Sequence, residues 1–437
     1  MSSVTATTRQ VDNAFLSARG AKTASYKDFL YDTFAKVLEN IFDAKQNPQG
    51  TVNLGTSVNC LMEEELTSRL MQGDALNVLT KHLQYAPWSG SLKVREAVAN
   101  FLNRHLHPRQ AILPNNLVLG CGVTSCLDAL AHTLCDAGDV IITPTPVYAR
   151  IFTDVRDVSD VCVEPLVLSD KEDSNGVRFS LEANSLEHCI KKLKTEGRRV
   201  RAFILINPHN PLGDIYPPSL VAQLMDVCAR HQIHFISDEI YALTVFDEDS
   251  TFRSALTLDL PDPHRTHILW AVSKDFGFAG ARFATIITFS DEVLACLSNA
   301  AAFKNIPLIM QHAIATLLND TAWCDEYFLP TNKKRIAQNY KITLEHLEKM
   351  GVTVKKSKAG LFVWFNVQAF MKQQTEEEEM ALYGELLDAG LYINPGARMY
   401  CSSPGWMRLI FAVKLPVLEE GLKRLESVLM ARKRKLD

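Results

Sequence analysis

The stretch at residues 268–277 reads Ile-Leu-Trp-Ala-Val-Ser-Lys-Asp-Phe-Gly. Its first five residues are a short apolar run bounded by loop residues, which predicts a buried strand over 268–272. Ser273 and Lys274 come directly after it, so a hydroxyl and an amine lie just past the end of that strand. A lysine in a loop means little alone, so its role depends on what other segments bring to the same place.

Two upstream segments repeat this arrangement. An apolar run at 202–206 is followed by Asn207-Pro208-His209-Asn210-Pro211, and a run at 234–237 is followed by Asp238-Glu239-Ile240-Tyr241. Ligands of parallel α/β sheets bind at the carboxyl ends of the strands. We therefore expect polar residues from all three segments to converge on one crevice.

Strands and helices alternate from residue 60 to about residue 320. Apolar residues at helical spacing predict a helix at Leu92–Leu106, and the runs at 117–119 and 140–142 flank a predicted helix at 125–134. This alternation is typical of an α/β fold with a mainly parallel sheet that is covered on both faces.

The C-terminal part has a different pattern. A helical stretch at 314–347 precedes predicted strands at 361–367, 392–393 and 407–411, which indicate a smaller α+β domain. The expected organisation is an N-terminal arm with part of the small domain at 1–55, a large domain at 56–320 and a C-terminal small domain at 321–437.

Three local patterns lie outside the predicted sheets. Residues 1–25 are rich in Ser, Thr and Ala without an apolar period, so we expect a mobile arm there, followed by a helix at 26–42. Thr375-Glu376-Glu377-Glu378 resembles a capping box at the solvated start of a helix. The basic cluster at 432–435 predicts the C-terminal end of a helix.

The composition predicts an ordinary globular protein. The 437 residues are 47% hydrophobic and 22% charged, with a net charge of -4 that argues against a nucleic-acid partner. Ten cysteines without CxxC pairs predict reduced, mostly buried thiols, and no spacing suggests a metal site. No run is long and apolar enough to span a bilayer, so we expect a cytoplasmic protein without membrane contacts.

The three polar segments carry a recognisable set of chemical groups. A buried lysine readily loses its proton, so Lys274 can form an imine with an aldehyde. Asp238 can pair with a pyridine nitrogen, and Tyr241 and Asn210 can donate hydrogen bonds to a ring oxygen. These groups are what pyridoxal 5'-phosphate requires, which predicts a cofactor-dependent enzyme of amino acids with Lys274, Asp238 and Tyr241 as its catalytic residues.

Further candidates complete this hypothesis. Gly122-Val123-Thr124 lies between a predicted strand and helix, where backbone amides and the Thr124 hydroxyl can bind phosphate, and Arg282 supplies a second phosphate charge. Tyr148 can stack on the cofactor ring. Arg408 is the candidate anchor for a substrate α-carboxylate, because a guanidinium can grip a carboxylate through two hydrogen bonds.

The motifs resemble those of fold type I pyridoxal-phosphate enzymes, in the class I and II aminotransferase family with the aspartate-aminotransferase fold. More narrowly, the chain resembles the 1-aminocyclopropane-1-carboxylate synthase subgroup, and its run at 260–283 is similar to the animal synthase-like proteins. The motifs that carry the likeness lie at 47–50, 207–213, 237–246, 273–277 and 403–408. The resemblance covers residue 40 to the C-terminus.

The resemblance implies a homodimer with shared active sites, in which Tyr85 reaches the cofactor phosphate of the neighbouring subunit. It also implies the roles given above, and Gly55 and Asn210 join Arg408 as candidate substrate-binding residues. Three departures stand out: Val58 replaces a glutamate of the plant synthases, Ala271 replaces a phosphate-binding serine, and Ala284 replaces a glycine.

The expected activity is transamination of a 2-amino acid with a 2-oxo acid. The alternatives, in order, are carbon–sulfur β-lysis of cystine-like substrates, 1-aminocyclopropane-1-carboxylate synthesis and a catalytically inactive dimeric scaffold. Transamination and β-lysis would use the same residues, and the sequence does not reveal which amino-acid side chain is recognised.

Overall fold

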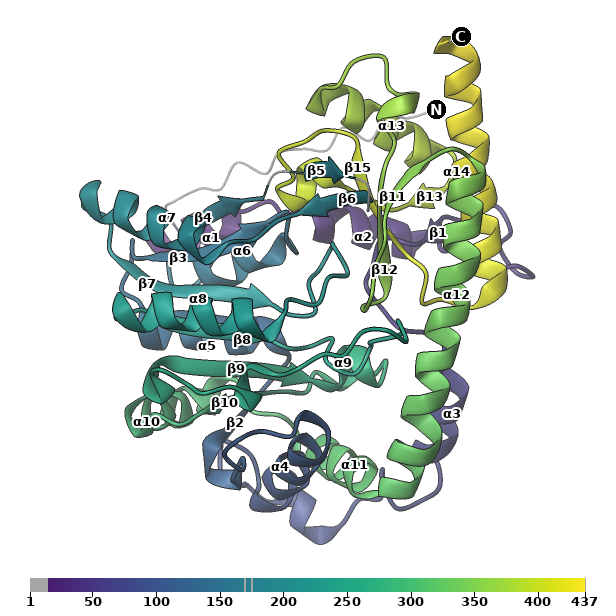
Figure 1. Ribbon diagram of the computed structural model, residues 1–437. Coiled ribbons are helices and arrows are strands. Elements are labelled where there is room, and N and C mark those ends of the chain that lie inside the picture. Colours follow the sequence, from purple (N-terminus) through teal and green to yellow (C-terminus); the bar gives the residue numbers. More distant parts are fainter. Residues whose placement is uncertain (1–14, 169, 174–175, 437) are drawn as a thin grey trace.

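A computed structural model describes residues 15–168, 170–173 and 176–436 (Figure 1). Its main feature is a seven-stranded sheet in which only β10 runs antiparallel to its neighbours. The strand order is β2 (Leu117–Gly120), β10 (Ala284–Thr288), β9 (Thr266–Ala271), β8 (His234–Asp238), β7 (Val200–Ile206), β3 (Val140–Thr145) and β4 (Cys162–Val167). The predicted mainly parallel sheet is therefore confirmed.

Alternate residues of the strands pack into two different apolar layers, as the period of two in a strand requires. Phe203 and Leu205 of β7 face one layer, and Ile204 and Ile206 face the other. The first layer is covered by α4 (Leu92–Leu106), α7 (Ala183–Thr195), α8 (Pro218–Arg230) and α11 (Leu308–Asn319). The second is covered by α5 (Val123–Leu134), α6 (Arg150–Arg156) and α10 (Asp291–Ala300).

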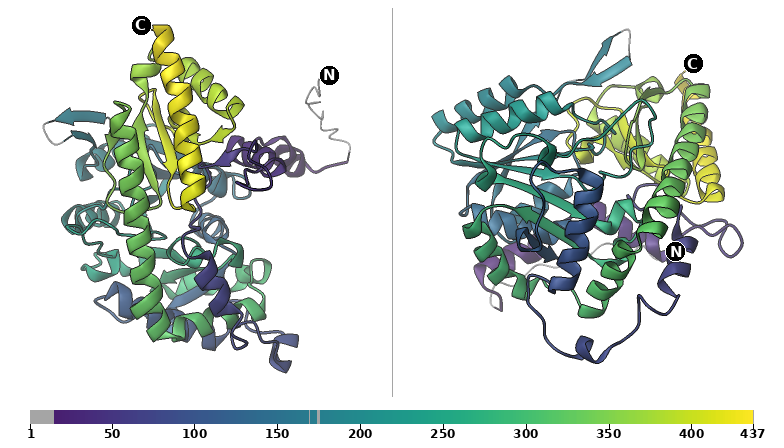
Figure 2. Two further views of the ribbon diagram at one scale, coloured as in Figure 1. Left: turned by 90° about the vertical axis from the view of Figure 1, so that its right-hand side faces the viewer. Right: turned by 60° about the horizontal axis from the view of Figure 1, so that its bottom comes forward.

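A smaller antiparallel sheet is formed by the C-terminal part. Its order is β11 (Thr353–Lys355), β12 (Phe362–Asn366), β15 (Trp406–Ile410) and β14 (Asn394–Pro395). The accompanying helices are α12 (Leu329–Lys349), α13 (Glu376–Asp388) and α14 (Leu415–Leu436). Figure 2 shows α12 and α14 side by side. The predicted α+β unit is thus present, whereas the domain bounds at 1–55, 56–320 and 321–437 stay a prediction.

Short elements join these two parts. The N-terminal β1 (Val52–Asn53) pairs in parallel with β13 (Leu391–Tyr392) of the C-terminal part. A hairpin of β5 (Asp170–Asp173) and β6 (Gly176–Phe179) extends from the large part. A π-helix at Ala322–Phe328 interrupts the stretch that was predicted as one or two long helices at 314–347.

The N-terminal prediction was partly wrong. Residues 18–25 form a helix that was not predicted, α1 (Ala18–Ser25), whose start is capped by the Ser17 hydroxyl, while the mobility of the arm stays a prediction. The helix expected at 26–42 is shorter, because α2 (Phe29–Glu39) begins only after Asp28, whose carboxylate accepts hydrogen bonds from the amides of Leu30 and Tyr31. The part of the predicted arm at 1–14 lies outside the described residues.

Two other expectations need correction. Only three of the ten cysteines are buried (Cys126, Cys228 and Cys324), while five are half-buried and two are exposed. The acidic run at α13 is capped by Thr375 as predicted, but it continues into Glu379, which is buried and accepts hydrogen bonds from the amides of Ala397 and Gly405. The predicted basic helix end at 432–435 is the last turn of α14.

Candidate active site

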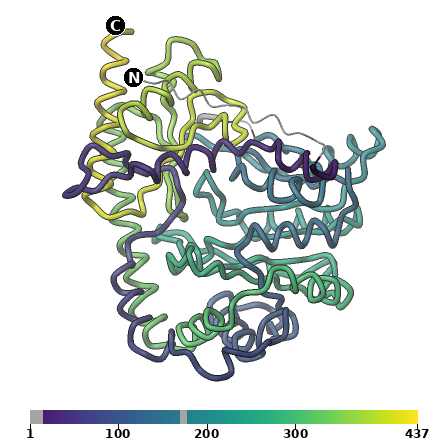
Figure 3. The backbone as a smooth tube through the Cα atoms, turned by 180° about the vertical axis from the view of Figure 1, so that it is seen from behind, coloured from purple at the N-terminus to yellow at the C-terminus, as the bar shows by residue number. Residues whose placement is uncertain are grey.

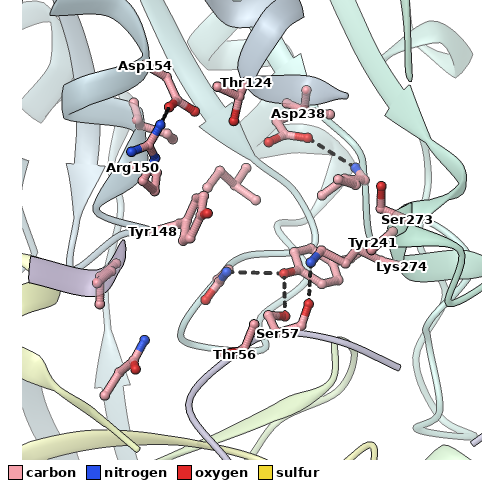
Figure 4. Close-up of a pocket in the computed structure, with 18 of the residues that line it drawn as sticks. Thr56, Ser57, Thr124, Tyr148, Arg150, Asp154, Asp238, Tyr241, Ser273 and Lys274 are labelled. Carbon is pink, nitrogen blue, oxygen red and sulfur yellow. Dashed lines mark hydrogen bonds and ion pairs between the residues drawn. The ribbon is translucent and has the colours of Figure 1, made fainter. Parts of the chain in front are cut away.

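A cavity of about 350 Å³ lies where the carboxyl ends of the large-sheet strands meet α2 and the smaller sheet. Every predicted site residue except Tyr85 lines it. The ten residues are Gly55, Val123, Thr124, Tyr148, Asn210, Asp238, Tyr241, Lys274, Arg282 and Arg408. The expected convergence of three strand ends on one crevice is therefore confirmed, and Figure 4 shows part of the arrangement.

Lys274 lies on a single helical turn, α9 (Val272–Asp275), directly after β9. Its Nζ donates to the backbone oxygen of Ser57 (Figure 4). Burial, and then the positive charge of Arg408, lowers the pKa of Lys274 to about 8, against a smaller opposing effect of Asp238. A much larger fraction of this amine is therefore neutral near neutral pH than for an ordinary lysine.

Asp238 is the last residue of β8, and its carboxylate accepts a hydrogen bond from the amide of Ile240 at 3.2 Å. Burial raises the pKa of Asp238 to about 7. A positively charged partner in the cavity would lower this pKa again and keep the carboxylate ionised. Asp238 is therefore ready to pair with a cationic ring nitrogen.

Tyr241 and Asn210 form a hydrogen-bonded pair. The Asn210 amide nitrogen donates to the Tyr241 hydroxyl over 3.2 Å, and that hydroxyl also lies 3.1 Å from the hydroxyl of Ser57 (Figure 4). Burial raises the pKa of Tyr241 to about 12, so its hydroxyl keeps its proton. A protonated phenol in this position can donate to an anionic oxygen.

Arg408 is buried on β15 and does not ion-pair with any carboxylate of the described residues. Its Nη1 donates to the side-chain oxygen of Asn210 at 2.9 Å, and its Nη2 donates to the backbone oxygen of Gly55 at 2.7 Å. Its buried Nε lacks a hydrogen-bond partner within the described part of the chain. A buried guanidinium bound only to neutral oxygens is suited to receive a carboxylate.

The start of α5 forms an anion cradle with Arg282. Gly122, with φ 83°, turns the chain from β2 into the helix, and a side chain on it would collide with the Arg282 guanidinium. Arg282 donates to the backbone oxygen of Cys121 at 3.2 Å. The first amides of a helix point outward without partners in the helix, so this cradle suits a phosphate.

Several lining residues were missed by the sequence analysis. Arg150 and Asp154 lie four residues apart on α6 and form an ion pair at 2.9 Å (Figure 4). Arg150 also pairs with Asp28. Burial raises the pKa of Asp154 to about 6, against the opposing charge of Arg150. The further missed residues include Leu30, Tyr31, Phe34, Thr56, Ser57, Tyr392 and Asn394. The i, i+4 spacing of opposite charges after Tyr148 was the one signal that could have found the ion pair.

The three departures from the synthases occupy different environments. Val58 is half-buried and is not one of the described residues that line the cavity, so the structure gives no support to a direct role of this position at the substrate. Ala271 and Ala284 are fully buried and face each other across β9 and β10.

Tyr85 lies away from the cavity, and its side chain is wholly exposed, at 103%. It lines a separate surface hollow together with His82, Pro87 and His312. Within this single chain, Tyr85 therefore does not line the cavity that holds the anion cradle of α5 and Arg282.

Comparison with known proteins gives a consistent picture. The family model for "Aminotransferase class I and II" matches residues 49–425. The mouse (Mus musculus) protein named 1-aminocyclopropane-1-carboxylate synthase-like protein 1 is 36% identical over 420 residues, which cover 96% of this chain and 84% of that protein. A human (Homo sapiens) relative is 36% identical over 426 residues, covering 97% of this chain and 75% of that protein, and its name is probable inactive 1-aminocyclopropane-1-carboxylate synthase-like protein 2.

Solved structures show the same fold. A double mutant of Thermus thermophilus aspartate aminotransferase superposes with a TM-score of 0.76 at 21% identity, covering 94% of this chain and 99% of that one. None of the helices in the described ranges is long and apolar enough to cross a membrane. Within the same ranges, no cluster of three or more His, Cys, Asp or Glu residues could hold a metal ion.

Proposed function

Because the chain belongs to the class I and II aminotransferases, we propose that it binds pyridoxal 5'-phosphate and transaminates a 2-amino acid with a 2-oxo acid. One observation carries this proposal. Lys274 is a buried amine with a lowered pKa, and it shares a single cavity with the Asp238 carboxylate and the Arg408 guanidinium. An amine, a carboxylate and a carboxylate receptor in one cavity are the parts that this chemistry needs.

The lining side chains fit the cofactor. The cradle of α5 and Arg282 would hold the phosphate, Asp238 would pair with the ring nitrogen, and Tyr241 with Asn210 would donate to the ring oxygen. Tyr148 would contact the ring face. When bound, the cofactor supplies an electron sink for the electrons that remain when the substrate loses its α-proton.

The chain's own residues would then bind and orient the amino acid. Arg408 would receive the α-carboxylate, with Gly55 and Asn210 beside it, and this contact would fix the direction of the Cα–H bond. Lys274 would remove the α-proton and return it, because a lysine with a pKa of about 8 exchanges protons readily near neutral pH.

We also propose that the protein is a homodimer with shared active sites. The segment at 71–92 exposes several large apolar side chains to solvent, which a second copy would cover. They are Met71, Leu76, Val78, Leu79, Leu83, Tyr85, Trp88 and Leu92. Tyr85 would then reach the phosphate of the neighbouring subunit, and removing its hydroxyl (Tyr85→Phe) should weaken cofactor binding without dissociating the dimer.

The inactive scaffold, the last of the four alternatives, gains support from a human relative whose name is probable inactive. Ala271 supports this candidate, since a phosphate-binding hydroxyl is expected at that position. The set of Lys274, Asp238 and Arg408 argues against it, because burying these three ionisable groups without ion-pair partners costs stability, and such groups with shifted pKa values cluster at functional sites.

The deciding experiment is visible spectroscopy of the purified protein with added pyridoxal phosphate and a panel of amino acids. Conversion of the lysine-bound band to the pyridoxamine form would support transamination. A persistent band with release of pyruvate and thiol from cystine would support β-lysis, and release of aminocyclopropane carboxylate would support the synthase. A protein without any band, indistinguishable from Lys274→Ala, would favour the scaffold.

A further inference from the structure

We propose that α2 forms the wall of the substrate side-chain subsite and that this subsite selects 2-amino acids with uncharged side chains. The inference rests on the proposed function, since it assumes that Arg408 holds the α-carboxylate. It adds the substrate class, which the sequence leaves open. The observations that carry it are the apolar side chains that α2 contributes to the cavity and the lack, among the described lining residues, of a charged group left over for a substrate side chain.

The helix α2 is held against the smaller part of the protein. Phe29 and Val37 pack against Tyr383 and Tyr392 of the smaller part, and this contact fixes the helix in place. Figure 3 shows the N-terminal segment running from the smaller part across to the large sheet.

The first half of α2 also contributes side chains to the cavity. Leu30 and Phe34, four residues apart, line it together with Tyr31. Leu30 and Phe34 are only half-buried, and Tyr31 is exposed at 64%, so apolar surface remains open to the cavity. Apolar surface that faces a ligand site favours an apolar ligand group.

The positive charges of the cavity are already assigned. Lys274 and Arg282 serve the cofactor, and Arg408 serves the α-carboxylate. Arg150 is the remaining cation in the lining, and it lies between two carboxylates, those of Asp28 and Asp154. Because Arg150 is already engaged by both carboxylates, a second carboxylate on the substrate would lose its water without gaining a free cation, which disfavours an acidic side chain.

The negative charges are also engaged. Asp238 serves the ring nitrogen, and Asp154 is held by its ion pair with Arg150. Asp28 accepts from Arg150 and from the first amides of α2. A cationic side chain against Leu30 and Phe34 would lose its water without gaining a free partner, which disfavours this class as well.

The test measures binding to the cofactor-loaded enzyme with 2-methyl amino acids, which lack the α-proton and are not deprotonated. Displacement of Lys274 by the analogue shifts the visible band, so the titration gives a dissociation constant without turnover. The probes are 2-methylleucine, 2-methylaspartate and 2-methylornithine. We expect 2-methylleucine to bind at least about ten-fold more tightly than either charged analogue.

A pair of variants at Phe34 tests whether α2 determines the preference among the three analogues. Phe34→Arg adds an unpaired cation and should shift the preference toward 2-methylaspartate by about ten-fold or more, whereas Phe34→Leu should preserve the wild-type order. Equal or tighter binding of a charged analogue by the wild type would overturn the inference while leaving the proposed function intact. An unchanged preference in Phe34→Arg would also overturn it. A protein without a lysine-bound band would overturn the proposed function and this inference together.

Discussion

Ala271 of β9 and Ala284 of β10 are direct cross-strand partners, and both are fully buried. These are two of the three positions at which the chain departs from the synthases it resembles. Opposite residues in an antiparallel pair share one side of the sheet, with Cβ atoms about 4.5–5.5 Å apart. The two departures therefore lie next to each other on the same side of the sheet.

This pairing predicts that restoring the serine affects cofactor binding and depends on its neighbour. Ala271→Ser should tighten the binding of pyridoxal phosphate by about five-fold, the effect of one hydrogen bond of about 1 kcal/mol. Adding Ala284→Gly should increase the gain, because it removes the facing methyl group. Equilibrium dialysis measures the affinity, and Ala271→Val is the control without a hydroxyl. An equal affinity of the wild type and Ala271→Ser would place this position outside the phosphate site.

The lowered pKa of Lys274 predicts the pH dependence of cofactor capture. Only the neutral amine attacks the aldehyde, so the capture rate should rise with pH and level off above about 8. An ordinary lysine would still gain rate up to its usual value of 10.5. Stopped-flow absorbance on the cofactor-free protein gives this profile. A rate that continues to climb well past 8 would contradict the proposed role of burial and of Arg408.

The contacts of Arg408 predict a defect that is specific for carboxylates. Arg408→Lys keeps the positive charge but loses the bidentate hydrogen bonding to the α-carboxylate. KM for a 2-amino acid should therefore rise by about a hundred-fold, equivalent to about 3 kcal/mol. A simple amine without a carboxylate should react equally slowly with the wild type and the variant, which makes it the control. A similar loss for both substrates would instead indicate general damage to the cavity.

Asp28 is predicted to be a positioning residue, since it both caps α2 and pairs with Arg150. Asp28→Asn keeps a good capping side chain, so α2 should remain helical. The variant loses the ion pair with Arg150, so α2 should be held less firmly at the cavity. We expect the preference for 2-methylleucine over charged analogues to fall several-fold in Asp28→Asn, with little change in Tm. Asp28→Ala should additionally lose about 1 kcal/mol of stability as the cap disappears.

An unchanged preference in Asp28→Asn would show that the ion pair with Arg150 does not position α2. A fall confined to Asp28→Ala would assign the whole effect to the cap. The ratio of analogue affinities separates these cases, because a change in stability alone moves all analogues equally.

Much of the site could be predicted because the local sequence determines which side chains lie just past the end of each strand. The apolar runs before Asn210, Asp238 and Lys274 are short and sharply bounded, and parallel strands place such ends at the same edge of the sheet. Ten of the eleven predicted residues consequently line one cavity. The N-terminal helices were harder to predict from the sequence, because α1 has no buried residue and its short apolar pattern is weak.

The sequence by itself determined the fold class, the order of the elements and the chemical groups at the strand ends, since these depend on periodicity and chain order. Tertiary structure alone decided which residues from distant segments meet in the cavity. The pairing of Arg150 with Asp28 joins positions 122 residues apart, and Arg408 reaches Gly55 across 353 residues. Such contacts arise from the packing of α2 and the smaller sheet against the large sheet, and no local pattern records them.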